Sequence, residues 1–139
     1  MQHSVCGKKF IYIFIYQVIM DLEKMILKYQ NKNLQNPIIV EGINDIKSLK
    51  KINFTGNIIN INRGKSLYNF SEYISNGYNT VILLTDFDKK GIFLKNKIES
   101  YLNSMDINVD LQLWNYIKNN YHINDVESMP ALVENNIIK

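Results

Sequence analysis

The sequence predicts an α/β fold, a Rossmann-like three-layer sandwich around a mostly parallel four-stranded sheet. Short apolar segments that read as buried strands alternate with segments whose apolar residues recur every three or four positions, as on one face of a helix. The strongest strand segment, TVILLTD at 80–86, is apolar on both faces, which is typical of a central parallel strand. The 139 residues contain no internal repeat and no long linker, so we expect one domain.

The elements are expected in the following order. The first helix is predicted over 20–35, where apolar residues recur on one face and acidic residues occupy the first turn. Asn44 is expected to cap the next helix. The expected strands lie at 37–42, 57–61, 80–86 and 109–114, the helices between them at 44–52, 67–78 and 94–105, and a further helical segment at 116–139. We therefore assign 36–115 to the sheet-containing core and 116–139 to a C-terminal helical extension of the same domain.

The N-terminal segment 1–19 does not fit this pattern. Phe10–Met20 is almost wholly apolar, yet its 11 residues fall short of the roughly 20 that a transmembrane helix requires. No small-residue cleavage site follows, as a secretory signal would require. We interpret 1–19 as a non-native or disordered extension with the natural start at Met20. The alternative is a short membrane-associating tail, without stable membrane insertion. Mass spectrometry of the native protein distinguishes a chain that begins at Met20 from one that begins at Met1.

The composition excludes several kinds of site. The single cysteine, Cys6, rules out a disulfide scaffold and a cysteine-based zinc site, and the two histidines are far apart in the sequence. The formal net charge of +3 permits a nucleic-acid partner but does not require one. These features favour a cytoplasmic protein.

Acidic side chains follow two of the expected strands. Glu41 ends the first strand, Asp86 ends the third, and Asp88 comes two residues later, on the same side of an extended chain as Asp86. Ligands of open α/β sheets bind at the carboxyl ends of strands. Adjacent carboxylates repel one another unless a cation lies between them, and Mg²⁺ is the hard cation that prefers oxygen ligands. The sequence therefore predicts a Mg²⁺ site, with Mn²⁺ as a substitute, suited to phosphoryl chemistry.

Several acidic residues and glycines of the sequence also have a purely structural interpretation. Asp88 is placed to cap the helix that follows it, and Asp45 to interact with a helix dipole. The expected backbone turns at the site are Gly42, Gly64 and Gly91. A late acidic pair, Asp125 and Glu127, is best explained by the start of a helix.

Basic residues near the expected site are candidates for binding phosphate or nucleic acid. Arg63, the only arginine, and Lys65 follow the second strand, and Lys89 follows the third. Arg63 has the geometry to hold a phosphate through two parallel hydrogen bonds, although a solvated loop arginine is an equally good interpretation. Trp114 is interpreted as a residue at the edge of the core.

Two motifs in this order carry a resemblance to a known family. PIIVEGINDIKSL, followed about 45 residues later by VILLTDFDKKG, resembles the Toprim domain of topoisomerases, primases and certain nucleases. The resemblance covers 36–115 and is most similar to small stand-alone archaeal Toprim proteins, then to the maturase ribonuclease of 5S ribosomal RNA. It implies a parallel sheet between helices and a magnesium site. Within that site, Asp86 and Asp88 would bind the metal, and Glu41 would bind it or act as general acid or base.

The expected function is accordingly that of a magnesium-dependent Toprim protein, a nuclease or a nuclease subunit acting on nucleic-acid phosphodiester bonds. Glu41 and Asp86 are the candidate catalytic residues. A second hypothesis is a non-catalytic module that binds metal and a nucleotide or RNA within a larger complex with a protein partner. A third, a phosphohydrolase of the haloacid-dehalogenase type, fits less well because its Asp-x-Asp normally lies on the first strand.

Overall fold

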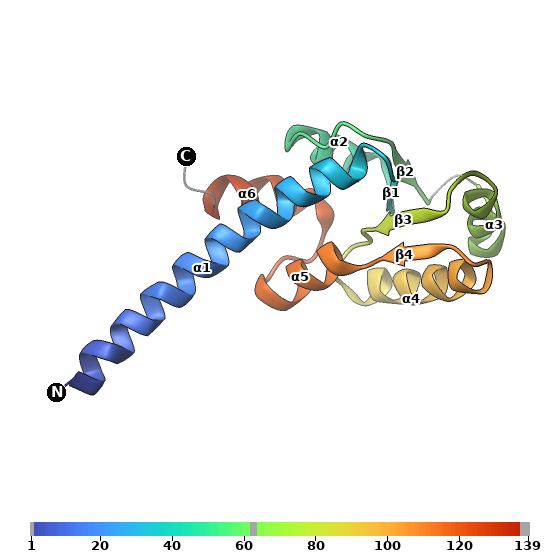
Figure 1. The fold of residues 1–139 in the computed structure, drawn as a ribbon. Coiled ribbons are helices and arrows are strands. Elements are labelled where there is room, and N and C mark those ends of the chain that lie inside the picture. The colour runs from blue at the N-terminus through green and yellow to red at the C-terminus, as the bar shows by residue number, and fades with distance from the viewer. Residues whose placement is uncertain (1, 62–63, 137–139) are drawn as a thin grey trace.

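A computed structural model describes residues 2–61 and 64–136, with only the backbone described at 2–7 and 17–20. Its elements alternate as the sequence predicts (Figure 1). The strands are β1 (Ile38–Val40), β2 (Ile58–Asn60), β3 (Thr80–Leu83) and β4 (Asn108–Asp110). The helices are α1 (Gln2–Asn33), α2 (Ile43–Lys51), α3 (Leu67–Gly77), α4 (Lys89–Ser104), α5 (Gln112–Asn120), the short 3-10 helix η1 (Val126–Ser128) and α6 (Met129–Asn136).

The four strands form one sheet in the order β2-β1-β3-β4, and every pair is parallel. The pairing of Ile39 with Leu83 fixes the register between β1 and β3. All strands consequently end at the same edge of the sheet. The residues that follow β1 and β3 are therefore neighbours in space although they lie far apart in the sequence.

Helices cover both faces of the sheet, which confirms the predicted three-layer α/β sandwich. On one face, α3 and α4 bury Phe70, Ile74, Ile98 and Leu102 against the strands. On the other face, α1, α2, α5 and α6 enclose a second cluster of buried side chains. Neighbouring residues of a strand serve opposite faces, and both faces are apolar. This explains why β3 lacks the alternation of a half-exposed strand.

The fourth strand is shorter than predicted, and helix α5 replaces much of it. The alternation over 109–114 suggested a strand to Trp114, but β4 ends at Asp110 and α5 begins at Gln112. The Asp110 carboxylate accepts a hydrogen bond from the Gln112 backbone N–H at 2.9 Å, which turns the chain out of the sheet. Leu113, Trp114 and Ile117 then face the core from a helix, a spacing that overlaps with strand alternation over so few residues.

Two helix starts also differ from expectation. The cap of α2 is Gly42 rather than Asn44, because the Asp45 carboxylate accepts a hydrogen bond from the Gly42 N–H at 3.1 Å. Helix α1 runs through the boundary predicted at residue 20 without a break. No glycine or proline lies between Gly7 and Pro37 to interrupt it. Among the side chains of α1 that the structure describes, those that reach the core lie in its second half and include Leu22, Ile26 and Tyr29.

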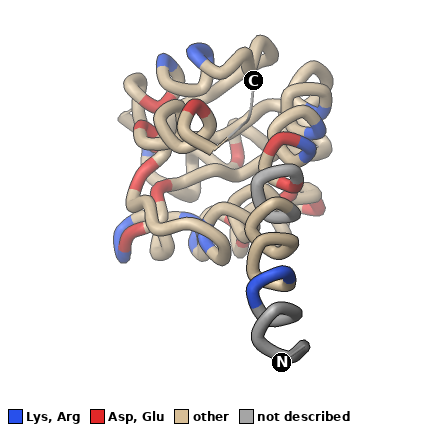
Figure 2. Tube along the Cα trace, turned by 90° about the vertical axis from the view of Figure 1, so that its left-hand side faces the viewer, with Lys and Arg blue, Asp and Glu red and all other residues tan. Residues whose placement is uncertain are grey.

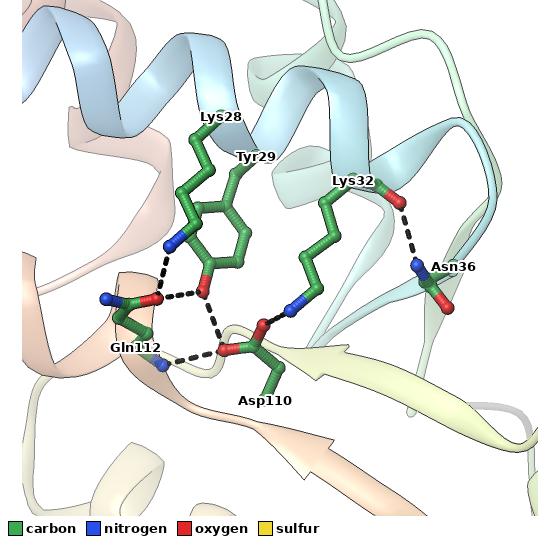
Figure 3. A network of polar contacts seen from close by, with 6 residues as sticks. All are labelled: Lys28, Tyr29, Lys32, Asn36, Asp110 and Gln112. Carbon is green, nitrogen blue, oxygen red and sulfur yellow. Dashed lines mark hydrogen bonds and ion pairs between the residues drawn. The ribbon is translucent and has the colours of Figure 1, made fainter.

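A polar network fastens α1 to the end of β4 (Figure 3). The Tyr29 hydroxyl donates to Asp110 Oδ1 at 2.7 Å and lies 3.1 Å from Gln112 Oε1, while Lys32 forms an ion pair with Asp110. Burial alone would raise the pKa of Asp110, but hydrogen bonds from Lys32 and Tyr29 outweigh it and hold that pKa below its ordinary value. The network thus fixes the second half of α1 over the carboxyl edge of the sheet.

Replacing Tyr29 with Phe should destabilise the protein through this network. The substitution keeps the buried ring but leaves Asp110 without its hydroxyl donor, at a cost of about 1–2 kcal/mol. Urea unfolding followed by circular dichroism measures the change. Tyr68→Phe, at a side chain that is 49% exposed, is the matched control and should leave the midpoint unchanged. Equal effects of the two substitutions would contradict the assigned role of the network.

Candidate active site at the carboxyl edge of the sheet

Glu41 and Asp86 meet where β1 and β3 end. Glu41 follows β1 by one residue, and its Oε2 accepts a hydrogen bond from the Asp86 backbone N–H at 2.7 Å. The Asp86 side chain also contacts the C-terminal segment, because its Oδ1 accepts a hydrogen bond from the Val126 N–H at 3.0 Å. The parallel register explains the contact, because it places the residues after Ile39 beside those after Leu83. The structure thus joins two of the three predicted acidic residues directly.

Asp88 lies on the same loop but has a structural task as well. It is the N-cap of α4, and its Oδ1 accepts from the Gly91 N–H at 2.8 Å, as the capping interpretation predicts. Phe87, between the two aspartates, is 1% exposed and packs against Trp114 with ring centroids 5.6 Å apart. Because Phe87 turns inward, Asp86 and Asp88 are both left at the outer side of the loop.

The backbone of this loop packs very tightly against Gly91. A Cβ placed on Gly91 would lie 1.9 Å from the Asp86 carbonyl oxygen, which no side chain can tolerate. The buried Thr85 hydroxyl adds a hydrogen bond to the Gly91 carbonyl at 2.8 Å. Gly91 is therefore required for the shape of the loop that carries both aspartates.

The carboxylates at this edge share a charge-rich, partly buried environment. Burial raises the pKa of Glu41, and Asp86 and Asp88 add to the rise, while the Asp86 N–H and the charge of Lys90 oppose it. Burial likewise raises the pKa of Asp86, with Asp88 and Asp125 contributing. Both raised pKa values mean that the ionised forms of Glu41 and Asp86 are less favourable here than in water. A cation bound between the carboxylates would stabilise these ionised forms.

Asp45 belongs to the same charge cluster, although the sequence suggested only a dipole interaction. Its side chain is 5% exposed, and burial, reinforced by Asp86, raises the pKa of Asp45 to about 6. Glu127 and Asp125 raise it further. The helical spacing that brings Asp45 back toward Gly42 also places its carboxylate in a buried position, and no local sequence pattern indicates this second effect.

Stability should therefore fall as the pH rises from about 4 to about 7. The folded-state pKa of Asp45 lies above its ordinary value of 3.8, so the folded protein binds a proton more tightly than the unfolded chain in this range. Asp45→Asn removes that proton equilibrium and keeps an oxygen for the Gly42 N–H. We expect the difference in stability between the variant and wild type to shift in favour of the variant by about 2 kcal/mol between pH 4.5 and pH 7. Urea midpoints across this range test it, and parallel pH profiles of the two proteins would contradict it.

The end of the predicted core and the segment that follows it hold the acidic loop in place. Trp114 is buried, as expected, and its Nε1 donates to the Thr85 carbonyl at 3.0 Å. Lys118 donates to the Phe87 carbonyl at 3.0 Å, and the Phe87 N–H donates to the Asn124 carbonyl at 2.9 Å. The region assigned to a C-terminal extension is thus part of the site. A lysine on a helix carries no sequence signal for such a contact.

The late acidic pair has the structural role that the sequence favoured. Asp125 caps η1, because its Oδ1 accepts from both the backbone N–H and the hydroxyl of Ser128, at 2.9 and 2.6 Å. Both acidic residues also act on Asp45, as its raised pKa indicates. Their second effect is therefore to add negative charge to this edge.

The predicted phosphate-binding residues are not all found at the acidic edge. Lys65 is exposed, and its ammonium lies 4.5 Å from the centre of the Tyr73 ring, beside α3. Lys89 is exposed at the first position of α4, but the charge that acts on Glu41 is that of Lys90. Arg63 lies outside the described residues. Of the two predicted phosphate ligands that the structure describes, Lys89 lies next to the acidic loop and Lys65 lies beside α3, and the structure adds Lys90.

The predicted glycine turns also differ in character. Gly64 has a φ of +74°, which favours glycine, whereas Gly42 is extended with a φ of −145° and no atom within 4 Å of an added Cβ. There is therefore open space beside Gly42 at the N-terminus of α2, whereas the backbone at Gly91 lies in close contact with the backbone of Asp86. Backbone conformation thus favours glycine at position 64, the close approach to Asp86 requires it at position 91, and neither applies at position 42.

The three acidic side chains at this edge offer the type of ligand that a hard divalent cation prefers. They do not surround a common point as the ligands of a closed metal site do. Glu41, Asp86 and Asp88 offer carboxylate oxygens, the ligands that Mg²⁺ prefers. Among residues 2–61 and 64–136, however, no three Asp, Glu, His or Cys side chains converge closely enough to enclose an ion. The chemistry of the site therefore fits magnesium held by one or two carboxylates with water or phosphate completing the shell, as is usual for this ion.

Comparisons with known proteins agree with this fold. No protein-family model matches the sequence. A solved structure of a putative protein from Aquifex aeolicus superposes with a TM-score of 0.68 at 29% identity, covering 77% of this chain and 96% of the other. Since that protein shares the arrangement of strands and helices, the α/β sandwich has an experimental counterpart.

Relatives with higher sequence identity are archaeal. A UPF0292 protein of Methanosarcina barkeri is 38% identical over 98 residues, which cover 69% of this chain and 68% of the relative. A UPF0292 protein of Thermoplasma volcanium is 50% identical over 115 residues, which cover 83% of this chain and 97% of the relative. With half of the aligned residues identical to a relative that it spans almost completely, this chain belongs to the UPF0292 protein family.

Proposed function

We propose that the protein is a magnesium-dependent enzyme of the Toprim class that cleaves nucleic-acid phosphodiester bonds, alone or as the subunit of a nuclease. The observation that supports it best is the contact between Glu41 and Asp86 at the ends of neighbouring parallel strands, with Asp88 on the same loop. This arrangement is the one that the resemblance to Toprim domains implies for Glu-Gly and Asp-x-Asp. Nucleic acid as substrate makes the cytoplasm the expected compartment.

Each side chain has a distinct task in this proposal. Asp86 and Asp88 would hold Mg²⁺ through the carboxylate oxygens that do not accept from Val126 and Gly91. When bound, the ion supplies charge neutralisation at a phosphate oxygen. Glu41 retains a proton to a higher pH than an ordinary carboxyl because burial raises its pKa, and this suits it to donate a proton to a leaving oxygen.

Lys90 provides positive charge on the same side. Its charge acts on Glu41, and it lies in the first turn of α4, where the helix dipole also favours a phosphate. A substrate phosphate would thus meet a cationic helix terminus beside the acidic loop. Local placement of charge, rather than the net charge of +3, would carry nucleic-acid binding.

One observation favours a second candidate, a non-catalytic module that binds metal and a nucleotide or RNA. Asp86 Oδ1 and Asp88 Oδ1 are both engaged by backbone N–H groups, and no closed three-carboxylate site exists in the described part of the chain. Such a module would act with a protein partner. It would bind nucleic acid in a metal-dependent manner and leave the phosphodiester bonds intact.

Removal of the metal tests the proposed function. The full chain is incubated with end-labelled single- and double-stranded DNA and RNA, in Mg²⁺, in Mn²⁺ or in a chelator. We expect cleavage of at least one substrate with either metal, and background levels with the chelator. Metal-dependent binding without cleavage across all substrates would support the second candidate, and cleavage that persists in the chelator would contradict both.

A further inference from the structure

Residues 8–16, the part of the first half of α1 whose side chains the structure describes, are exposed and include a run of large apolar side chains that covers no part of the core. All seven residues from Phe10 to Tyr16 are between 49% and 72% exposed, although each is aromatic or isoleucine. The helix continues past the sandwich and projects from it, with its N-terminus far from the sheet (Figure 1). An apolar surface of this size on a projecting helix indicates contact with something outside the chain.

The side chains on this helix are sorted by chemistry around its axis. At about 100° per residue, Lys8, Lys9, Tyr12 and Tyr16 fall within roughly one quarter to one third of the circumference. Phe10, Phe14 and Ile11 point to the opposite side. One side therefore carries ammonium and hydroxyl groups at the tips of long side chains, and the other side carries hydrocarbon only.

A second copy of the chain is a poor occupant for this surface. The apolar run of 11 residues is about 16 Å long, or three helical turns. A pair of such short helices buries far less than the roughly 1,200 Å² that stable interfaces require. It would also cover one side only and leave either the phenylalanines or the tyrosines in water.

A membrane surface fits the whole pattern. Among the described residues, no helix has both the length and the apolar character needed to cross a bilayer. A helix that lies in the interface needs only an apolar side for the acyl boundary and a cationic side for the headgroups. Tyrosine rings are enriched at the headgroup level of membranes. The methylene groups of a lysine side chain can lie in the apolar region while its ammonium group reaches the anionic headgroups.

We propose that residues 8–16 bind the surface of an anionic lipid membrane, with Phe10, Ile11 and Phe14 in the acyl boundary. Charge complementarity supports this occupant, because the segment 1–19 contains two lysines and no acidic residue. Figure 2 shows this basic stretch near the end of α1, separated by uncharged residues from the acidic positions of the body. The binding is peripheral and reversible, since a single short helix inserts only into the interface.

Sedimentation of the full chain with lipid vesicles tests the proposal. We expect binding to vesicles with 30 mol% phosphatidylglycerol and about tenfold weaker binding to pure phosphatidylcholine. Phe10→Gln combined with Phe14→Gln should weaken binding to the anionic vesicles by more than about 50-fold. The matched control on the headgroup side, Tyr12→Gln with Tyr16→Gln, should stay within about threefold of wild type.

A loss of vesicle binding in these variants cannot be attributed to unfolding, because residues 10–16 contribute no buried side chain to the core. All variants should therefore keep the Tm of the wild type. Several results would overturn the proposal. These are no vesicle binding, equal losses in the phenylalanine and tyrosine variants, a stable lipid-free dimer that the phenylalanine variant dissociates, or a native chain that begins at Met20 and so lacks the segment.

Discussion

Asp86→Asn is expected to abolish magnesium-dependent activity, by more than about 100-fold, and to leave the fold intact. Even residues that merely support metal ligands cost 10- to 100-fold when they are replaced, so loss of a charged ligand should cost at least as much. The amide oxygen of Asn can still accept from the Val126 N–H, and this preserves the connection to the C-terminal segment. Activity assays paired with magnesium titration by calorimetry measure both effects.

Asp106→Asn is the matched control for this substitution. Asp106 is exposed after α4 and has a φ of +62°, a conformation that Asn adopts readily, so the same chemical change should alter neither activity nor stability. If Asp86→Asn retains wild-type cleavage and magnesium affinity, Asp86 is not a metal ligand and the proposed function loses its central residue.

Gly91→Ala is expected to have the largest effect on stability. The added Cβ would meet the Asp86 carbonyl oxygen at 1.9 Å, the carbonyl carbon at 2.4 Å and the Cα at 2.9 Å. These are backbone atoms of a loop held from both sides, so the strain cannot be relieved by rotating a side chain. We expect a loss of about 3 kcal/mol or more and a fall in Tm of roughly 10 °C.

Gly42→Ala provides the contrast within the same site. A Cβ at this position meets nothing within 4 Å, and the extended backbone suits any residue, so thermal unfolding should be unchanged. Differential scanning calorimetry of both variants is sufficient. Equal losses at positions 42 and 91 would contradict the assigned role of the close approach between Gly91 and Asp86.

The sequence was most informative where a local pattern is compatible with only one structure. The continuous apolar run of β3 left no solvent-facing side and so predicted a central parallel strand, which the sheet order confirms. The contact between Glu41 and Asp86 follows from the rule that parallel strands end at one edge, given that the first and third strands are neighbours, and the sheet order shows that they are. Capping by Asp88 followed from local spacing alone.

Predictions from the sequence were wrong or missing in two situations. In one, the periodicities of a strand and a helix could not be distinguished over a short segment; in the other, a contact joined residues far apart in the sequence. Six residues cannot separate a strand from the first turns of a helix, so α5 was missed at Trp114. The burial of Asp45 depends on what packs over α2, and the bond from Lys118 to Phe87 joins residues 31 positions apart. Such contacts depend on how whole elements dock, and a local pattern does not encode this.

The hydrogen bonds that link the acidic loop to Asn124 and Val126 also have a consequence for biosynthesis. A nascent chain exposes Glu41, Asp86 and Asp88 before residues 124 and 126 are made, so the loop gains these two partners only after synthesis has passed residue 126. The acidic centre therefore acquires its full set of hydrogen bonds later than its own residues are synthesised.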